Sequence, residues 1–237
     1  IMNNGAISDE LGVKGMDRSS EEYITAREII LANSVKGNIH ICHISTKGCV
    51  DIIREAKRLG VHVTCETAPH YFMLTHEKLR SRNANDRMNP PLREEFDRKA
   101  IEEAVIDGTV DCIITDHAPH TQEEKADFEK APNGIVGLET SFSAVLTALY
   151  HTGKISLQRI NELMNINPRN LLGLSPETLE VGAPANLILA DLNQKWVVDT
   201  TKLHSKSCNT AFRDMELTGK VLMTISDGEI RYEYENQ

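Results

Sequence analysis

Short apolar segments alternate with longer amphipathic segments along the first half of the chain. Residues 38–43, 61–66 and 110–115 have the length and apolar content of buried strands, and residues 46–59 and 93–106 have apolar side chains at helical spacing. Strands that alternate with helices of this size are typical of a parallel sheet or of a (β/α) barrel. The alternation therefore predicts an α/β fold, and the crossover lengths allow either architecture.

Three further helices are predicted, over residues 19–35, 138–150 and 156–164. The first begins at two serines and two glutamates, which are common at the start of a helix. It ends before Gly37, and glycine is common just after the end of a helix. Residues 117–137 are polar and show no period, and a loop of that length in a compact enzyme is usually functional.

The pattern changes after Gly182. Residues 186–190 and 195–198 alternate like strands, and residues 220–225 and 229–235 flank an Asp-Gly pair, which predicts a β-hairpin. We therefore expect a small β module in this part of the chain.

Composition limits what the chain can do. Hydrophobic residues make up 40% of its 237 residues, which is enough for a packed core, and the net charge of −9 argues against binding to nucleic acid. No apolar run is long enough to span a bilayer and no signal-peptide pattern is seen, so we expect no membrane partner. The five cysteines form no CxxC pair, and Cys42, Cys65 and Cys112 lie in apolar strand-like runs, so they are interpreted as reduced core thiols of a cytoplasmic protein.

Side chains of the metal-ligand type follow the three predicted strands. His43 closes the first strand, His70 lies just past the second, and Asp116 closes the third. Because the carboxyl ends of parallel strands meet at one edge, these side chains could converge there, and histidine with aspartate suits zinc or a similar divalent ion. On spacing alone the alternative stays open that each is a hydrogen-bonded structural residue, with Asp116 capping a turn.

Three loops contain candidate binding residues. Asn89 precedes two prolines that hold the backbone extended, and its amide could recognise a ring amide or imide. His120 could reach a substrate carboxylate, whereas His117 could orient its loop. Asn133 and Gly134 precede a helix, and glycine permits close approach of the backbone to a ligand. The structural alternative for these segments is an ordinary loop or a lid hinge.

Taken together, these segments resemble dihydroorotases, which are cyclic amidohydrolases of the amidohydrolase superfamily. The ordered set is similar to the longer, class I bacterial type and covers nearly the whole chain. Its main motifs, in chain order, are His43-Ile44-Ser45-Thr46-Lys47, Ala68-Pro69-His70, Met88-Asn89-Pro90-Pro91-Leu92-Arg93, Thr115-Asp116-His117-Ala118-Pro119-His120 and Gly134-Ile135-Val136-Gly137-Leu138-Glu139-Thr140.

The resemblance implies a fold and a metal site. Residues 1–178 would form part of a TIM-like (β/α) barrel of the amidohydrolase type, and residues 179–237 would form a β-sandwich segment. The site would hold two zinc ions, with His43 and His70 on one ion. Asp116 would bind the other ion and shuttle the catalytic proton.

The implied activity is the reversible hydrolysis of (S)-dihydroorotate to N-carbamoyl-L-aspartate, a step of de novo pyrimidine biosynthesis. By the family pattern the substrate would be held by Asn89, His120, Asn133 and Gly134. The family often has phenylalanine where Asn133 stands, which weakens the argument for that contact.

The family's first barrel strand carries a His-x-His zinc pair, and no such pair occurs in this sequence. We therefore expect the chain to correspond to the C-terminal part of the enzyme, to be inactive alone and to bind at most one metal ion, weakly. The edges of an incomplete barrel would favour association with a partner. A homodimer and a complex with aspartate transcarbamoylase are both compatible with the resemblance.

Two other interpretations stay open. The first is a sister enzyme, a hydantoinase or allantoinase, against which Asn89 and His120 argue. The second is a non-catalytic dihydroorotase-like subunit that scaffolds aspartate transcarbamoylase. The presence of His43, His70 and Asp116 argues against that subunit.

Overall fold

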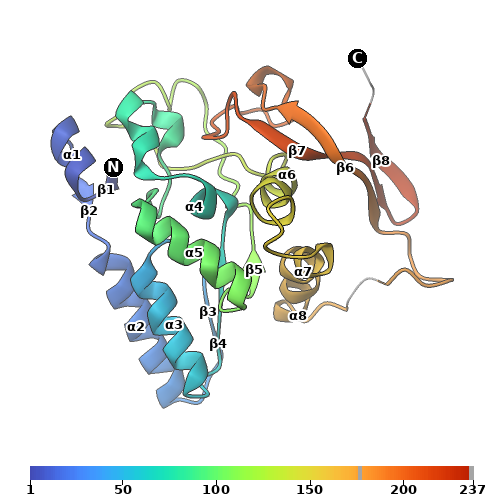
Figure 1. Ribbon diagram of the computed structural model, residues 1–237, viewed down its shortest axis with the longest axis horizontal. Helices are drawn as coiled ribbons and strands as arrows, with labels where there is room; N and C mark the ends of the chain where they lie inside the picture. Colours follow the sequence, from blue (N-terminus) through green and yellow to red (C-terminus); the bar gives the residue numbers. More distant parts are fainter. Residues whose placement is uncertain (176–177, 235–237) are drawn as a thin grey trace. The chain divides into compact units, whose positions relative to one another are not determined.

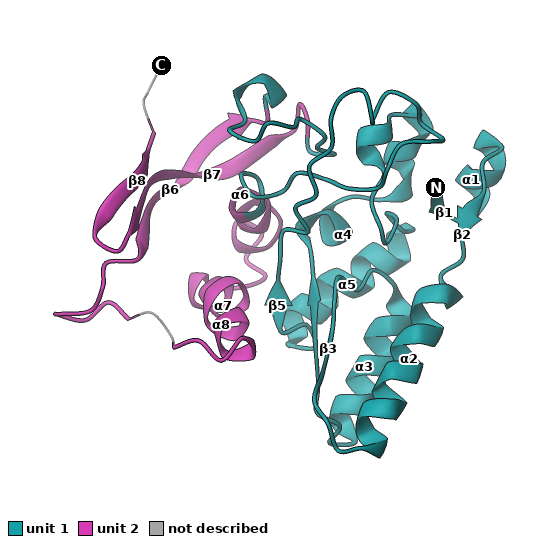
Figure 2. Ribbon diagram, turned by 180° about the vertical axis from the view of Figure 1, so that it is seen from behind, with its two compact units in different colours: residues 1–141, 199–212 teal, residues 142–198, 213–237 magenta. Residues whose placement is uncertain are grey.

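The computed structural model describes residues 1–175 and 178–234. The chain divides into two compact units, which Figure 2 shows in different colours. Residues 1–141 and 199–212 form the first unit, and residues 142–198 and 213–237 form the second. The expected domain boundary between residues 178 and 179 stays a prediction.

The first unit contains a parallel sheet whose strands alternate with helices, as the sequence predicted. The strand order is β3-β4-β5, and Figure 1 shows the helices α2, α3 and α5 side by side next to this sheet. The elements are α2 (Ser19–Ser34), β3 (Ile39–Ile41), α3 (Lys47–Arg58), β4 (Val63–Thr67), α5 (Glu95–Asp107) and β5 (Cys112–Ile113). The α/β prediction is confirmed, while the partial barrel stays a prediction.

Local chemistry explains where these elements begin and which face they bury. The hydroxyl of Thr46 accepts a hydrogen bond from the Cys49 amide at 3.2 Å and so caps the start of α3. The buried residues of α3 recur at helical spacing, as do those of α5, which ends at Gly108 in the left-handed conformation. Along β4 the odd-numbered residues are buried, whereas Thr64 and Glu66 between them are partly exposed.

Several short elements of the first unit were not predicted. They lack the length over which apolar periodicity can be recognised. They are β1 (Met2–Asn3), α1 (Ala6–Leu11), β2 (Gly15–Met16), α4 (Pro69–Met73) and the 3₁₀ helices η1 (His76–Ser81), η2 (Ala84–Asp86) and η5 (Thr200–Lys202). Residues 117–137 form the predicted long loop, in which an isolated bridge joins His117 to Ile135.

The second unit combines short helices with an antiparallel sheet of order β6-β7-β8. Its elements are α6 (Ser141–Val145), whose first residue belongs to the first unit, η3 (Leu146–Tyr150), α7 (Leu157–Asn161), η4 (Glu162–Ile166), α8 (Asn167–Leu171), β6 (Leu187–Val197), β7 (Glu216–Ser226) and β8 (Glu229–Glu233). The predicted helix over 138–150 begins three residues later, and it ends in a π-helical turn. The sheet confirms a β module, while the β-sandwich stays a prediction.

The predicted hairpin is confirmed, because Asp227 and Gly228 both have the positive φ that a tight turn between β7 and β8 requires. Glu235, which was predicted to end the last strand, lies outside the described residues. The two strands predicted before the hairpin are one strand, β6. Its register shifts between Asp191 and Lys195. The irregularity interrupts the alternation of side chains there, so the sequence pattern predicts two strands instead of one.

Candidate active site

His43 lies two residues beyond the end of β3, where the chain leaves the sheet. Its backbone has φ of 37°, a conformation that is uncommon outside glycine. Its Nδ1 atom is buried and, in the part of the chain that the structure describes, has no hydrogen-bond partner. An imidazole nitrogen that is hidden from water and unpaired is costly unless something absent from the structure binds it.

His70 lies in α4, directly after β4, and is 1% exposed. Its Nε2 atom is also buried without a partner among the described residues. Burial, with a further contribution from nearby His43, lowers the pKa of His70 to about 3. The ring is therefore neutral at physiological pH, which is the form that binds a metal ion.

Asp116 follows β5 and also has positive φ, 49°. Burial raises the pKa of its carboxyl, the neighbouring His43 opposes that rise, and Glu66 adds to it. His43 thus lies within electrostatic reach of both His70 and Asp116. The structure brings the three predicted residues into one region of the first unit.

These three residues do not form the tightest group of ligand atoms. Among residues 1–175 and 178–234, a group of three possible ligand atoms that all lie within 4.8 Å of one another is made by His40, Cys42 and Glu66. No functional role was predicted for any of these three residues. Their convergence depends on the register of β3 against β4, which the sequence pattern does not specify.

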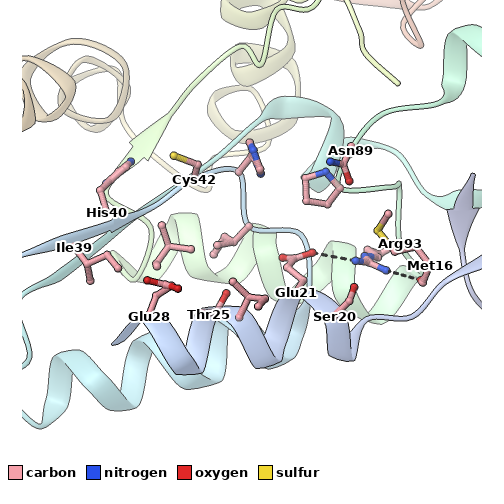
Figure 3. A pocket seen from close by; sticks show the side chains of 15 residues that line it. Met16, Ser20, Glu21, Thr25, Glu28, Ile39, His40, Cys42, Asn89 and Arg93 are labelled. Atoms are coloured by element: carbon pink, nitrogen blue, oxygen red, sulfur yellow. Dashed lines mark hydrogen bonds and ion pairs between the residues drawn. The ribbon is translucent and has the colours of Figure 1, made fainter. Parts of the chain in front are cut away.

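Asn89 shares a cavity with His43. The cavity has a volume of about 510 Å³ and is lined by residues of α2, of β3 and of the loop that contains Asn89 and Pro90 (Figure 3). Asn89 is exposed and precedes a cis peptide bond to Pro90. The Tyr71 hydroxyl donates to the Pro90 carbonyl at 2.8 Å, which fixes this loop to the helix that carries His70.

The other three predicted substrate residues lie together. His120 donates from Nε2 to the Asn133 carbonyl at 3.0 Å, and its Nδ1 lies 3.5 Å from Glu124. At Gly134 a Cβ atom would approach the Ala118 carbonyl and the His120 ring to 2.8 Å, so a side chain there would displace His120. His120 also lines a second, smaller pocket. Because both of its nitrogens face protein acceptors, His120 would have to exchange one contact to hold a substrate.

Lys125 is a residue whose importance the sequence did not reveal. It is buried, and its ammonium group donates to four carbonyl oxygens. These belong to Pro132 at 2.7 Å, Gly134 at 3.0 Å, Ala84 at 3.2 Å and Arg87 at 3.3 Å. Burial, together with the Arg87 guanidinium, lowers the pKa of Lys125 to about 8. This lysine joins the loop that carries Gly134 to the segment that leads to Asn89.

Arg93 was part of a recognised motif, but its role was not predicted. It donates to the Ser45 hydroxyl at 3.0 Å, to Asn3 at 2.9 Å and to the Glu21 carboxylate at 3.0 Å. Figure 3 shows Arg93 and Glu21 paired beside the cavity that Asn89 lines. No local pattern marks this network, because its members lie far apart in the sequence.

Comparison with known proteins identifies the family. Residues 21–231 match the model of the Amidohydrolase family. The chain is 48% identical over 231 residues to a dihydroorotase of Trichlorobacter lovleyi, covering 97% of this chain and 54% of that protein. It is 45% identical over 238 residues to a dihydroorotase of Thermoanaerobacter sp., covering 100% of this chain and 55% of that protein.

Solved structures agree on the fold. An L-hydantoinase from Arthrobacter aurescens superposes with a TM-score of 0.81 at 30% identity, covering 90% of this chain and 48% of the other. A D-hydantoinase from Thermus sp. gives a TM-score of 0.85 at 23% identity, covering 97% and 51%, and this likeness concerns the fold alone.

The chain therefore belongs to the amidohydrolase family, and the predicted resemblance to dihydroorotases is confirmed. It spans about half the length of the dihydroorotases that it matches. In the described residues, no helix has the length and apolar character needed to cross a membrane.

Proposed function

We propose that the protein of this chain is a zinc-dependent dihydroorotase, which interconverts (S)-dihydroorotate and N-carbamoyl-L-aspartate in pyrimidine biosynthesis. The observation that carries this proposal is that His43 and His70, close to Asp116, each have a buried imidazole nitrogen without a partner among the described residues. The identity to dihydroorotases, 45–48% over nearly the whole chain, supports dihydroorotate as the substrate. The activity is proposed for the whole protein.

The residues present fit a divalent metal ion. Two imidazoles, each with a buried nitrogen that has no partner among the described residues, and a nearby carboxylate are the ligand types that zinc prefers. We assign His43 and His70 to one ion and Asp116 to a second. When bound, zinc would act as a Lewis acid toward the ring carbonyl and would lower the pKa of a water molecule.

The chain's own residues would position the substrate and move the proton. Water hydrolyses the ring amide, so its oxygen joins the carbonyl carbon, the C–N bond breaks and a proton must reach the ring nitrogen. We assign that transfer to Asp116, since partial burial raises the pKa of its carboxyl and favours its holding a proton between the two steps. Asn89 would bind the ring amide from the cavity that it shares with His43.

His120, Asn133 and Gly134 would bind the substrate carboxylate. Their mutual contacts support a common role, because movement of one displaces the others. The partial barrel, the β-sandwich, the cytoplasmic location and association as a homodimer or with aspartate transcarbamoylase are part of the same proposal. So is the expectation that this chain alone is inactive.

A second candidate is a hydantoin-hydrolysing enzyme. The observation in its favour is the L-hydantoinase structure, which superposes on 90% of this chain at 30% identity. Both candidates hydrolyse a cyclic amide, so the metal site does not separate them. The substrate carboxylate separates the two candidates, because dihydroorotate carries one and hydantoin does not.

The test uses a fusion protein. It joins these 237 residues to the part of the Trichlorobacter lovleyi dihydroorotase that this chain does not match. Initial rates with dihydroorotate, hydantoin and allantoin are measured with added zinc. We expect dihydroorotate to be the preferred substrate, and Asp116→Asn to lower kcat at least about 100-fold. The control is Asp227→Asn in the hairpin turn, which should keep the rate.

Preference for hydantoin, or an undiminished rate with Asp116→Asn, would contradict the dihydroorotase proposal. If the fused protein does not fold, zinc binding by the chain itself is measured by calorimetry. The proposed ligands predict that binding weakens at least about tenfold in both His43→Gln and His70→Gln. Equal affinity in those variants would exclude this zinc site.

A further inference from the structure

A second cluster of metal-ligand side chains lies on the parallel sheet. His40 is in β3, Cys42 directly follows that strand, and Glu66 is in β4. In the register of the two parallel strands His40 lies opposite Thr64 and Ile41 lies opposite Cys65, so Glu66 follows at the level of Cys42. Since side chains two residues apart share a face, the three side chains converge.

The geometry suits one cation. One ligand atom from each residue lies within 4.8 Å of the other two, and His40 Nε2 is 3.1 Å from Glu66 Oε2. Two ligands placed about 2.1 Å from one tetrahedral zinc ion are about 3.4 Å apart. The cluster therefore needs little rearrangement to surround an ion.

His40 is held in the orientation that a ligand needs. Its Nδ1 lies 2.8 Å from the Thr64 hydroxyl, which in turn lies 3.5 Å from the Ile39 carbonyl. Without an ion, Nε2–H donates to Glu66 and Nδ1 accepts from the Thr64 hydroxyl. An ion in place of that proton would take the Nε2 lone pair, and the hydroxyl could then turn to the Ile39 carbonyl and accept from Nδ1–H. An oriented histidine with a hydrogen bond on its other nitrogen is the usual arrangement around protein-bound metals.

The site is accessible and separate in composition from the proposed hydrolytic site. Figure 3 shows His40 and Cys42 projecting from the same side of β3, away from α2. Cys42 is exposed, so the prediction that it is a core thiol was wrong, while His40 and Glu66 are partly exposed. The cluster shares no residue with His43, His70 and Asp116, and it includes a sulfur ligand, which that set lacks.

We propose that His40, Cys42 and Glu66 bind a zinc ion, with water completing the coordination. A nitrogen, a sulfur and an oxygen ligand together favour zinc over magnesium or calcium, which prefer oxygen alone. This inference does not depend on the proposed hydrolytic function.

The test uses cobalt as a spectroscopic substitute for zinc in the 237-residue chain. A thiolate bound to cobalt gives a near-ultraviolet charge-transfer band that histidine and carboxylate ligands do not give. We expect this band in the unsubstituted chain, its loss in Cys42→Ser, and its displacement by zinc. The matched control is Cys208→Ser, because Cys208 is also partly accessible but lies outside the cluster.

Further variants separate this site from the hydrolytic one. His40→Gln should weaken cobalt binding at the thiolate site at least about tenfold, and Thr64→Val about tenfold, because it removes the orienting hydroxyl. The double variant His43→Gln/His70→Gln should keep the band. Circular dichroism establishes that each variant is folded.

No charge-transfer band in the unsubstituted chain, or a band that persists in Cys42→Ser, would overturn the inference. Cobalt binding without a thiolate band would leave the hydrolytic proposal intact and reduce this cluster to a hydrogen-bonded pair of His40 and Glu66. A thiolate band together with no effect of the His43 and His70 substitutions on zinc affinity would support this site and count against the hydrolytic one.

Discussion

Neighbouring histidines of this chain have different environments, which determine what each can do. His40 has a partner for both ring nitrogens, whereas His43, three residues later, has a buried nitrogen with no partner among the described residues. His70 is more deeply buried than either. Residue type alone therefore does not distinguish a structural histidine from a candidate metal ligand.

The low pKa of His70 predicts how the stability of the metal-free protein depends on pH. The unfolded chain binds a proton at this residue below about pH 6.5, whereas the folded chain does so only near pH 3. The unfolded state thus holds more protons between these values, and stability falls as the pH is lowered through that range. Lowering the pH from 7.5 to 5 should therefore reduce the free energy of unfolding by about 2 kcal/mol through this residue.

The measurement is urea unfolding with a chelator at the two pH values. His70→Gln should lose less stability on acidification than the unsubstituted chain, by about that 2 kcal/mol. His62→Gln is the control, because His62 is exposed and its replacement should leave the full loss in place. If His70→Gln and the unsubstituted chain lost the same stability on acidification, the low pKa of His70 would be contradicted. Unfolding is followed by circular dichroism, since the one tryptophan, Trp196, lies in the second unit.

At the scale of elements, strand ends and one loop carry the candidate site. The helices α2, α3 and α5 were predicted to within a few residues, because their apolar periodicity is repeated several times. The helix predicted over residues 156–164 continues through η4 and α8 to Leu171, and β6 was predicted as two strands. The loop over residues 117–137 was predicted only as irregular. The contacts that give this loop its shape are made by Lys125, which no periodic pattern marks.

Lys125→Met should destabilise the loop. The Pro132 carbonyl would lose its 2.7 Å bond to the ammonium group, and three other carbonyls would lose one contact each. We expect a loss of about 1–3 kcal/mol at pH 7 and faster hydrogen exchange at the Gly134 amide, which bonds to Arg87. Lys130→Met, in the same loop, is the control, since the Lys130 side chain is 86% exposed. Equal exchange rates in the two variants would show that Lys125 does not hold the loop.

At the scale of the whole molecule, contacts between distant segments organise the first unit. Arg93 joins Asn3 near the start of the chain, Glu21 in α2 and Ser45 after β3. Its side chain is 2% exposed and that of Glu21 is 15% exposed. A buried charge of this kind costs free energy unless every donor is satisfied, and here three segments supply the acceptors.

Arg93→Met should therefore lower the free energy of unfolding by about 3–5 kcal/mol, because the Glu21 carboxylate would stay partly buried without its partner. Arg58→Met is the matched control and should change stability by about 0.5 kcal/mol or less, since Arg58 pairs with Glu55 at the exposed surface. Urea unfolding followed by circular dichroism measures both variants. A loss of under about 1 kcal/mol for Arg93→Met would show that the network does not stabilise the unit.

The sequence by itself determined what depends on neighbours along the chain. The alternation of strands and helices, the Asp227-Gly228 turn and the chemical type of the residues at strand ends all follow from local periodicity and conformational preference. These properties are fixed within a few residues, so they can be recognised without knowing the fold.

Only the tertiary structure decided which side chains meet and which polar atoms lack a partner. The convergence of His40, Cys42 and Glu66 depends on the register of two strands, and the free nitrogens of His43 and His70 depend on what buries them. The contacts of Lys125 and Arg93 likewise join segments far apart in the sequence. Burial and pairing are through-space properties set by packing, and no local pattern encodes them.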